Sequence, residues 1–418
     1  MTQAIAGYFV FLIASMFLAD KSNVIFCRNW KPVVFGVLLQ IFLAFSFTNS
    51  SICISAIEWM AKGIAKISDA TAEGTKFCFG YIGGGELPFE LKENGKSFIF
   101  AFQALPSIIL VSVLSAVLMH FKILPILSRV VGGILKFVFN IKLYIGMFAV
   151  TRIFIGPQEN LFFIKNKLNS LTKTETFTIL SLAFVTSSAG NMPVIANILS
   201  GVCPDALKHV ITASISNIIS VLILSRIAMP TEDSIVDERF DISEERKHTN
   251  LMSVISQGLS DGLNTWWRVV GSLIGVIALI YIINYTLALL PDYLSGGAIT
   301  LQKLFGLVMY PFTWLMGIDA QNLYKVAQII GTKIAVNETV AFSDLAKSSI
   351  SQVDITKSIY AICNFGNFST LGATISSMVA LAPKNTWTSK VIGRAFICGF
   401  LATCLSTTLM SIVFDVSK

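Results

Sequence analysis

The chain has 418 residues, of which 54% are hydrophobic and only 13% are charged. A soluble domain carries about 25% charged residues, so this composition excludes a soluble globular protein. The net charge of +7 is explained by basic loops on one side of a membrane and not by binding to nucleic acid. The lipid bilayer is therefore expected to surround most of the chain.

Apolar runs of helix length predict an all-α integral membrane protein. A transmembrane strand would need only about ten residues of alternating character, whereas these runs are continuous. Because no basic region or small-residue cleavage site accompanies the first run, we expect a retained helix and not a signal peptide. The clearest runs are Ala4–Ala19, Val33–Phe47, Ile99–Met119, Leu207–Met229, Val269–Leu290 and Val391–Val413.

Basic residues mark the loops expected on the cytoplasmic side. Asn49–Lys96 is then external, and its amphipathic stretch Ile54–Ile67 is expected to lie flat at the interface. The chain should cross the cell (inner) membrane several times, with both termini on the external, periplasmic side. Four basic loops lead to this orientation: residues 21–31, 122–142, 239–247 and 384–394.

One pattern occurs on either side of the charged segment Thr231–Asn250. Each half holds a polar-interrupted segment, an interrupted helix and a clean helix, in that order. Paired broken segments in corresponding places are the best sequence indication of a transporter substrate site. The segments are Tyr144–Leu168, Phe177–Gly201 and Leu207–Met229, and then Asp319–Lys347, Ile355–Leu381 and Val391–Val413.

The first broken segment contains Gly156–Pro157, which cannot continue a helix. The chain is expected to turn there as a re-entrant hairpin. Exposed backbone at membrane depth is tolerated only where it is buried in protein or lines a cavity. Gln158, Glu159 and Asn160 are therefore expected to face a cavity.

Polar residues interrupt the other three segments as well. Around Ser187 and Ser188, hydroxyls and freed carbonyls would suit Na⁺ or substrate hydroxyls. Asn337 and Glu338 lie in the middle of the third segment, and residues 363–373 read CNFGNFSTLGA. A single membrane hydroxyl is usually a packing residue.

The two carboxylates in these segments are different from the hydroxyls. An ionised carboxylate at membrane depth costs at least a few kcal/mol, so Glu159 and Glu338 are expected to be functional. The alternative is that both lie in aqueous loops.

Several short motifs occur in a fixed order along nearly the whole chain. The most specific are Gly156–Glu159, Val336–Glu338 and Phe365–Thr370. Four further pieces agree in order and spacing: Ser97–Ile109, Ser187–Gly190, Met229–Glu232 and Leu381–Pro383. As an ordered set, these motifs resemble the concentrative nucleoside transporter family.

The resemblance implies a homotrimer that imports nucleosides. Each protomer would have about eight transmembrane helices, two opposed re-entrant helical hairpins and interfacial helices, in an inverted pattern repeat. Residues 1–142, and residues 231–318 with the charged cytoplasmic loop, would form a scaffold. Residues 143–230 and 319–418 would form two transport repeats, each a hairpin with two helices, that move like an elevator.

The resemblance also assigns a substrate site. The first hairpin turn would read the base, and residues of the second half would hold the ribose hydroxyls. Amides and a carboxylate can satisfy the mixed donors and acceptors of a nucleobase, and a carboxylate accepts both hydrogen bonds of a ribose diol. The six residues are Gln158 and Glu159 for the base, and Glu338, Asn367 and Thr370, with Phe365 nearby, for the ribose.

Two positions depart from the family pattern. Pro157 has no donor and displaces Gln158 by one place, which leaves the base preference open. Arg152 stands where sodium-coupled members have an Asn that coordinates Na⁺ with a hydroxyl matching Ser187. A guanidinium has five donors and no acceptor, so we expect no sodium site around Arg152, Ser187 and Ser188.

The expected coupling ion is therefore a proton. Burial raises the pKa of a carboxylate toward neutrality, and an Arg beside Glu159 would oppose that shift, so Glu338 is the expected carrier. Arg152 would bond carbonyls around Thr186–Ser188 or pair with Glu159. The alternatives are that Arg152 faces the cytoplasm, and that transport is an uncoupled exchange.

A nucleoside transporter is the leading interpretation. The alternatives are a transporter of another small polar solute and a non-transporting membrane scaffold with the same hairpin domain. An enzyme is not expected, because no nucleophile–base pair appears. No metal or other cofactor is expected either, because the seven cysteines are scattered without a CxxC motif and the three histidines are isolated.

Overall fold

The computed structural model describes residues 1–19, 30–91, 97–156, 160–161, 163–185, 189–229, 250–289, 299–363, 366–381 and 389–416. Within these ranges the chain forms helices and no strand. In chain order they are α1 (Thr2–Met16), α2 (Trp30–Asn49), α3 (Ser51–Phe79), the 3₁₀ helix η1 (Gly80–Gly83), α4 (Phe100–Gln103), α5 (Ser107–His120), α6 (Ile123–Phe139), α7 (Leu143–Phe154), α9 (Lys165–Leu168), α10 (Lys173–Ala183), α11 (Met192–Leu199), α12 (Ala206–Ala228), α13 (Leu251–Leu287), α14 (Leu301–Leu315), α15 (Leu323–Ala335), α16 (Glu338–Ala346), α17 (Gln352–Cys363), α18 (Phe368–Leu381) and α19 (Ser389–Val416).

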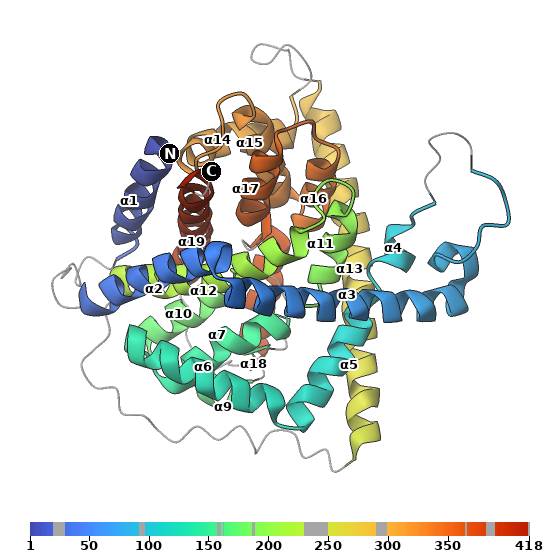
Figure 1. Ribbon diagram of the computed structural model, residues 1–418, viewed down its shortest axis with the longest axis horizontal. Coiled ribbons are helices and arrows are strands. Elements are labelled where there is room, and N and C mark those ends of the chain that lie inside the picture. The colour runs from blue at the N-terminus through green and yellow to red at the C-terminus, as the bar shows by residue number, and fades with distance from the viewer. Residues whose placement is uncertain are drawn as a thin grey trace.

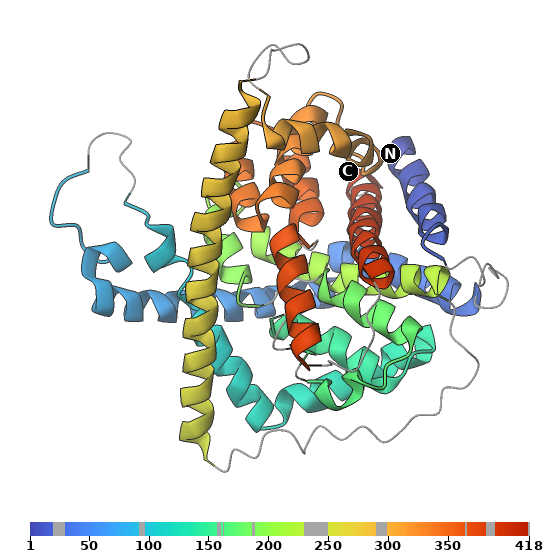
Figure 2. The same ribbon diagram turned by 180° about the vertical axis from the view of Figure 1, so that it is seen from behind.

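Two long helices form the centre of the molecule. The apolar windows of α12 and α19 are 89% and 78% buried inside the protein, against 17% for α2 and 6% for α13. Helices α1, α2 and α17 pack against this central pair, while α13 stands at the edge (Figures 1 and 2). The two central helices are those that follow the broken helix of each half.

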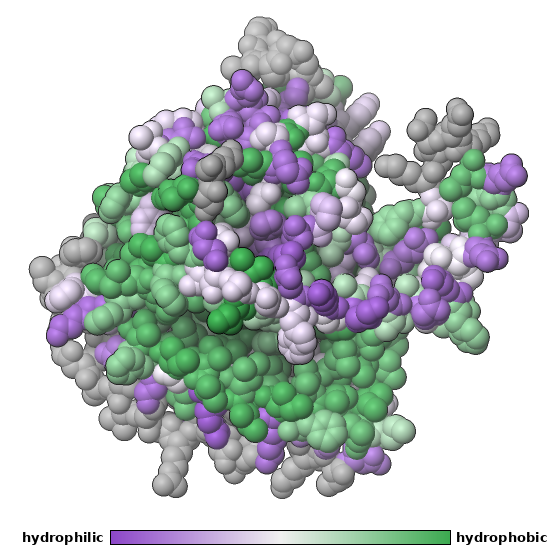
Figure 3. All heavy atoms as spheres, viewed as in Figure 1, coloured by the Kyte–Doolittle hydropathy of each residue, from purple (hydrophilic) through white to green (hydrophobic). Residues whose placement is uncertain are grey.

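The outer surface suits a lipid environment. Large apolar side chains are exposed on α2, α6 and α13, including Phe42, Phe137 and Ile274 at 66%, 89% and 67% exposure. Figure 3 shows apolar side chains over α5 and α6, whereas hydrophilic side chains follow α3. Lipid tails are as apolar as such side chains. Among the described residues, five helical stretches are long and apolar enough to cross a membrane: Trp30–Asn49, Phe100–His120 (α4 with α5), Ala206–Ala228, Leu251–Leu287 and Lys390–Val416.

Three elements differ in extent from the sequence prediction. The expected amphipathic stretch Ile54–Ile67 is part of the longer α3, which runs across the molecule and beyond its body toward α4 (Figure 1). The run Ile99–Met119 is divided into α4 and α5 just before Pro106, which lacks a backbone donor. Helix α13 begins at Leu251, well before the predicted run Val269–Leu290. The prediction missed the first part of the helix because polar residues there interrupt the apolar pattern.

Two glycines bring α6 and α7 into close contact. A Cβ atom at Gly132 would lie 2.7 Å from the backbone N of Met147, and one at Gly146 would lie 2.4 Å from the carbonyl O of Gly132. Small residues permit this backbone approach in membrane helices. The contact fixes α7, which begins the first broken segment, against an outer helix.

Candidate functional site

The first broken segment folds back on α7. Helix α7 ends at Phe154, and Ile155 is extended (φ −109, ψ 142). Asn160 then donates from Nδ2 to Phe148 O at 2.9 Å and accepts at Oδ1 from Thr151 Oγ1 at 2.7 Å. Asn160 is 0% exposed, so the prediction that it faces a cavity is wrong. Both polar atoms of the buried Asn160 amide therefore have partners on α7, and these two hydrogen bonds close the turn.

Arg152 is buried beside this turn, with only 3% of its surface exposed. Its Nη1 donates to Ile155 O at 3.1 Å. Its Nη2 lies 3.4 Å from Ala183 O, at the long end for a hydrogen bond. Ala183 is the last residue of α10, where helix carbonyls carry a partial negative charge. The guanidinium therefore faces the end of a broken helix and not the solvent.

The first broken helix is interrupted between α10 and α11. Asn191 occupies the N-cap position of α11. Within the break, Ala189 N donates to Ile153 O at 2.7 Å. The interruption is thus bonded directly to the last turn of α7.

Helices α15 and α16 meet at the third broken segment, around Val336 and Asn337. Asn337 caps α16, since its Oδ1 accepts from Val340 N at 3.0 Å. Glu338 begins α16, is half-buried, and accepts a 3.0 Å hydrogen bond from Asn191 Nδ2. This contact joins the second half of the chain to the break in the first half.

The second broken helix is interrupted between α17 and α18. Asn367 is 3% exposed, and its Oδ1 accepts from Thr370 N at 2.8 Å and from Thr370 Oγ1 at 3.1 Å. A Cβ atom at Gly366 would lie 3.2 Å from Phe184 O, in the break of the first half. The structure therefore brings Asn367 and Thr370 together and places the two breaks in contact.

Lys333 belongs to this site, although nothing in the sequence marks it. It lies on α15 and is 0% exposed. Its Nζ donates to Ile362 O near the end of α17, and Glu338 begins the next helix, α16. In sequence it is one more basic residue near a helix end, and only its burial distinguishes it. Asn191 was missed as a partner of Glu338 because the contact is long-range.

A capping box begins the first broken helix. Thr172 Oγ1 accepts from Glu175 N at 3.3 Å, and Glu175 Oε2 accepts from Thr172 N at 2.8 Å. Lys142, just before α7, forms a 2.8 Å ion pair with Glu175. Burial raises the pKa of the Glu175 carboxyl, but Lys142 and the Thr172 backbone N–H together lower it below its usual value of 4.5.

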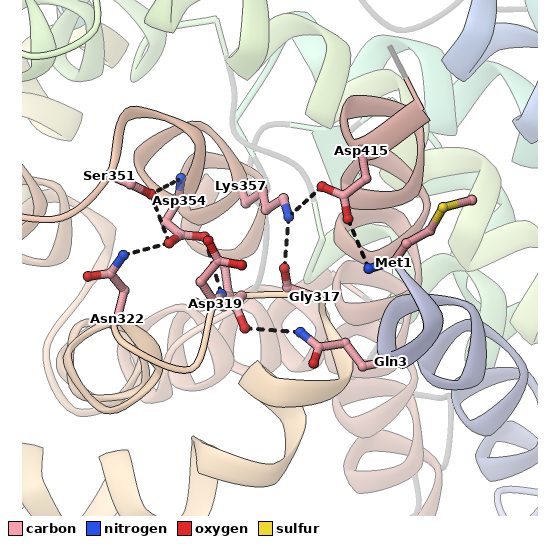
Figure 4. A network of polar contacts seen from close by, with 10 residues as sticks. Met1, Gln3, Gly317, Asp319, Asn322, Ser351, Asp354, Lys357 and Asp415 are labelled. Carbon is pink, nitrogen blue, oxygen red and sulfur yellow. Dashed lines mark hydrogen bonds and ion pairs between the residues drawn. The ribbon is translucent and has the colours of Figure 1, made fainter. Parts of the chain in front are cut away.

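A related pair, Ser351 and Asp354, lies at the start of the second broken helix (Figure 4). Ser351 Oγ donates to Asp354 Oδ2 at 2.9 Å and accepts from Asp354 N at 3.2 Å. Asn322, just before α15, donates to Asp354 Oδ2 at 2.6 Å. In each half, the residue before the hairpin helix therefore bonds the acidic residue in the first turn of the broken helix.

Figure 4 also shows how α17 is tied to both ends of the chain. Lys357 is 3% exposed and donates to Gly317 O at 2.8 Å and to Asp415 Oδ1 at 3.0 Å. The amino group of Met1 lies 3.2 Å from Asp415 Oδ2. These contacts fix the N-terminal half of α17 against α1 and α19.

The described part of the site contains both N-terminal and C-terminal helix ends, which carry opposite partial charges. The N-terminal ends of α11 and α16, which favour negative groups, meet at the Asn191–Glu338 contact. The C-terminal ends of α10 and α17, which favour cations, receive Arg152 and Lys333. A carboxylate, amides and a hydroxyl are thus available to hydrogen-bond a polar ligand. A guanidinium has no acceptor and cannot itself ligate Na⁺.

Several residues that the sequence indicates for the site fall outside the described ranges. They are Gln158, Glu159, Ser187, Ser188 and Phe365. Of the expected substrate and ion residues, the structure describes Arg152, Glu338, Asn367 and Thr370.

Models of the two ends of one protein family match the chain. The model described as Na⁺ dependent nucleoside transporter N-terminus matches residues 6–82, and the corresponding C-terminus model matches residues 209–411. Together they cover well over half of the chain. The first broken segment, with Arg152, lies between the two matched ranges.

Curated relatives match nearly the full length of the chain. An uncharacterized transporter of Haemophilus influenzae is 27% identical over 418 residues, covering 97% of this chain and 96% of the relative. The nucleoside permease NupC of Helicobacter pylori is 27% identical, covering 96% of this chain and 94% of the permease. Human solute carrier family 28 member 3 is 25% identical, but the match covers 57% of that longer protein.

Solved structures share the fold. CNTnw in an inward-facing substrate-bound state has a TM-score of 0.84 at 22% identity, covering 98% of both chains. A variant of CNTnw in an intermediate state has a TM-score of 0.87 at 23% identity and the same coverage. With two family models matched in the expected order and relatives aligned along the whole length, the chain belongs to the concentrative nucleoside transporter family.

Proposed function

We propose that the protein imports nucleosides across the cell membrane. The observation that carries the proposal is the hydrogen bond between Asn191 and Glu338, which brings a half-buried carboxylate to the break of the opposite half. Family membership supports the substrate class, and the relative from Helicobacter pylori is called a nucleoside permease. A carboxylate accepts both hydrogen bonds of a ribose diol.

The residues proposed to bind substrate come from both halves. Gln158 and Glu159 would read the base, while Glu338 and Thr370 would hold the ribose and Phe365 would lie beside it. The Oδ1 atom of Asn367 already accepts hydrogen bonds from Thr370. Its amide nitrogen is the group proposed to donate to the substrate.

The proposed mechanism is an elevator-type movement within a homotrimer of the inner membrane. Residues 143–230 and 319–418 would move together, and the contacts between their breaks at Gly366 and Phe184 support their acting as one body. Residues 1–142 and 231–318 would remain in place. The exposed apolar face of α13 is available for other protomers or lipid.

Proton coupling through Glu338 is proposed in place of sodium coupling. The buried guanidinium of Arg152 supports this, because it directs donors toward Ala183 O where the family's ion would need acceptors. A carboxylate is the group in this site that can take up and release a proton. Ser187 and Ser188 would then bond Arg152 or substrate and not a metal ion.

The decisive experiment is uptake of labelled uridine and adenosine into liposomes that contain the purified protein. An inward proton gradient and an inward sodium gradient are imposed separately, with choline replacing sodium in the control. We expect accumulation driven by the proton gradient and abolished by an uncoupler, with no response to sodium. Variant Glu338→Gln should lose the proton-driven accumulation.

Other outcomes would favour other interpretations. Sodium-driven uptake would overturn the interpretation of Arg152. Equilibration without accumulation under either gradient would indicate uncoupled exchange. No uptake of either nucleoside would favour another small polar solute or a non-transporting scaffold.

A further inference from the structure

Lys333 repeats in the second half what Arg152 does in the first. Each cation stands two residues before the end of its helix, α15 or α7. Lys333 donates to Ile362 O, next to the last residue of α17, and Arg152 reaches Ala183 O, the last residue of α10. Both cations are buried. Each half therefore places a buried cation near the end of α7 or α15, beside the C-terminal end of α10 or α17 respectively.

A buried ammonium is costly, so its surroundings must compensate for the lost water. Removing such an ion from water is unfavourable unless opposite charges and hydrogen bonds replace the solvent. The carbonyl end of α17 supplies a partial negative charge at Ile362. Glu338 begins α16, the helix that follows α15. Lys333 thus ties α15, just before Glu338 in the chain, to the end of α17.

Glu338 is consequently held by two elements. Asn191 donates to its Oε1 at 3.0 Å from the first broken helix, and α15, which Lys333 ties to α17, precedes it in the chain. A carboxylate has about four acceptor positions, so acceptor capacity remains for a ligand. Where the remaining acceptor positions of Glu338 point depends on how Asn191 and the anchored helix α15 place the carboxylate.

We propose that Lys333 is a positioning residue of the substrate site. Its ammonium ties α15 to the end of α17 and so holds the Glu338 carboxylate in the orientation that accepts hydrogen bonds from substrate hydroxyls. The proposal rests on the role given to Glu338 under the proposed function. Lys333 itself contacts neither the substrate nor the transported ion.

The test compares a ligand that has ribose hydroxyls with one that lacks them. Binding of uridine and of 2′,3′-dideoxyuridine to the purified protein is measured by calorimetry, together with KM and Vmax of uridine uptake. Lys333→Met removes the charge at similar length, and Lys333→Arg keeps it. Lys325→Met is the matched control, since Lys325 is exposed on the same helix.

We expect Lys333→Met to weaken uridine binding and raise its KM roughly tenfold, the loss expected when a charged hydrogen bond is misdirected. Binding of dideoxyuridine should change much less. Lys333→Arg should recover most of the uridine affinity, and Lys325→Met should match the wild type. Equal losses for both ligands, or a lower Vmax at unchanged KM, would overturn the proposal.

A second measurement separates this proposal from the proposed function. If the wild type binds neither nucleoside, the proposed function fails, and melting temperatures decide the role of Lys333. Lys333→Met, Glu338→Gln and the double variant form a cycle. We expect the double variant to lower the melting temperature by less than the sum of the single changes. Additive shifts would show that the two groups are not coupled and would overturn the proposal.

Discussion

Arg152 and Lys333 lie where helix carbonyls have lost their partners. A break in a helix leaves carbonyls without intrahelical donors, and a bound ion or a side chain can satisfy them. An ion can leave, whereas a side chain stays with the protein. At Ala183 and Ile362 this chain uses side chains.

Replacing Arg152 by Asn should make uptake sensitive to sodium. The change removes the guanidinium and restores the residue that sodium-coupled relatives are expected to use. In proteoliposomes we expect the variant's uptake to rise roughly tenfold when sodium replaces choline, equivalent to ~1.4 kcal/mol of ion binding. The wild type should not respond.

Arg152→Lys is the control, because it keeps a cation beside Ala183. It should stay indifferent to sodium. An Arg152→Asn variant that transports normally without responding to sodium would show that the charge at residue 152 does not decide ion use.

The Lys142–Glu175 pair should control how stability depends on pH. In the wild type the lowered pKa of Glu175 means that its ionised form stabilises the fold above pH 4.5, and this stability is lost as the pH falls through the folded-state pKa. Arg226 adds a further buried positive charge nearby. The Glu175 carboxyl lies at the start of α10, outside the candidate spans.

Variant Lys142→Met should lower the melting temperature at pH 7 by roughly 2–5 °C, because it removes the ion pair of a largely buried carboxylate. The Glu175 pKa should then rise, because only the Thr172 backbone N–H and the remaining neighbours oppose the effect of burial, so stability should fall less on acidification than in the wild type. Melting curves of the detergent-solubilised protein between pH 4 and 7 measure both effects. Parallel curves for the variant and the wild type would contradict the assignment.

At the scale of elements, both broken helices begin with a hydroxyl residue that bonds an acidic residue three positions later. Thr172 and Glu175 form a capping box, whereas Ser351 accepts from Asp354 N and donates to the Asp354 carboxylate. In each half this acidic residue is also bonded by the residue that precedes the hairpin helix. Each broken helix is therefore anchored at its start, and this anchoring allows its backbone to be irregular at the break.

The contact between α6 and α7 gives a prediction about packing. Gly132→Ala would place a Cβ atom 2.7 Å from Met147 N, so α6 must move away from α7 and the melting temperature should fall by several degrees. Gly133→Ala is a matched control, because nothing lies within 4 Å of its Cβ position. It should be neutral or slightly stabilising. A similar loss in both variants would mean that the close approach of α6 to Met147 does not set the result.

The sequence predicted the position of each break because the signals are local. Gly156–Pro157 marks the end of α7, and Asn337 marks the start of α16. The same local logic failed for Asn160, whose amide was expected to serve a ligand and instead bonds α7. A side chain that closes a turn and one that faces a ligand have the same sequence signal.

The pairings within the site could not be predicted from the sequence. Asn191 meets Glu338 only because α11 and α16 are brought together by folding. Lys333 resembles an ordinary loop-proximal lysine until its burial is known. Helix α13 was predicted too short for a related reason, since polar residues on a membrane helix obscure its apolar periodicity.

At the scale of the whole molecule, several polar contacts cross the boundary between the proposed fixed and moving parts, and one of them joins α2 to α12. Gln40 of α2 donates from Nε2 to Ser220 Oγ of α12 at 2.6 Å and accepts from Tyr8 at 3.1 Å. Tyr8, Gln40 and Ser220 are all buried. If α12 moves with the transport repeats, this contact must break in each cycle.

Crosslinking tests that movement. In a cysteine-free background, Gln40→Cys with Ser220→Cys should react with a short membrane-permeant bifunctional thiol reagent, and uptake should fall by more than tenfold until the link is reduced. Asn284→Cys with Gln302→Cys is the control pair, because these residues are bonded at 3.0 Å within the proposed scaffold. Efficient linkage of Gln40 to Ser220 with full uptake would rule out relative movement of α2 and α12.

The guanidinium of Arg152 also bears on the electrical work of transport. Moving one elementary charge through a membrane potential is worth about 2.3 kcal/mol per 100 mV. A dissolved cation that enters with the substrate and is released inside makes the trip once, so the potential drives accumulation. In the proposed elevator movement, a guanidinium attached to the chain travels inward when loaded and outward when empty, and the two contributions cancel. Under the proposed proton coupling, the voltage then acts on the cycle only through the proton, and accumulation should persist in media that contain almost no sodium.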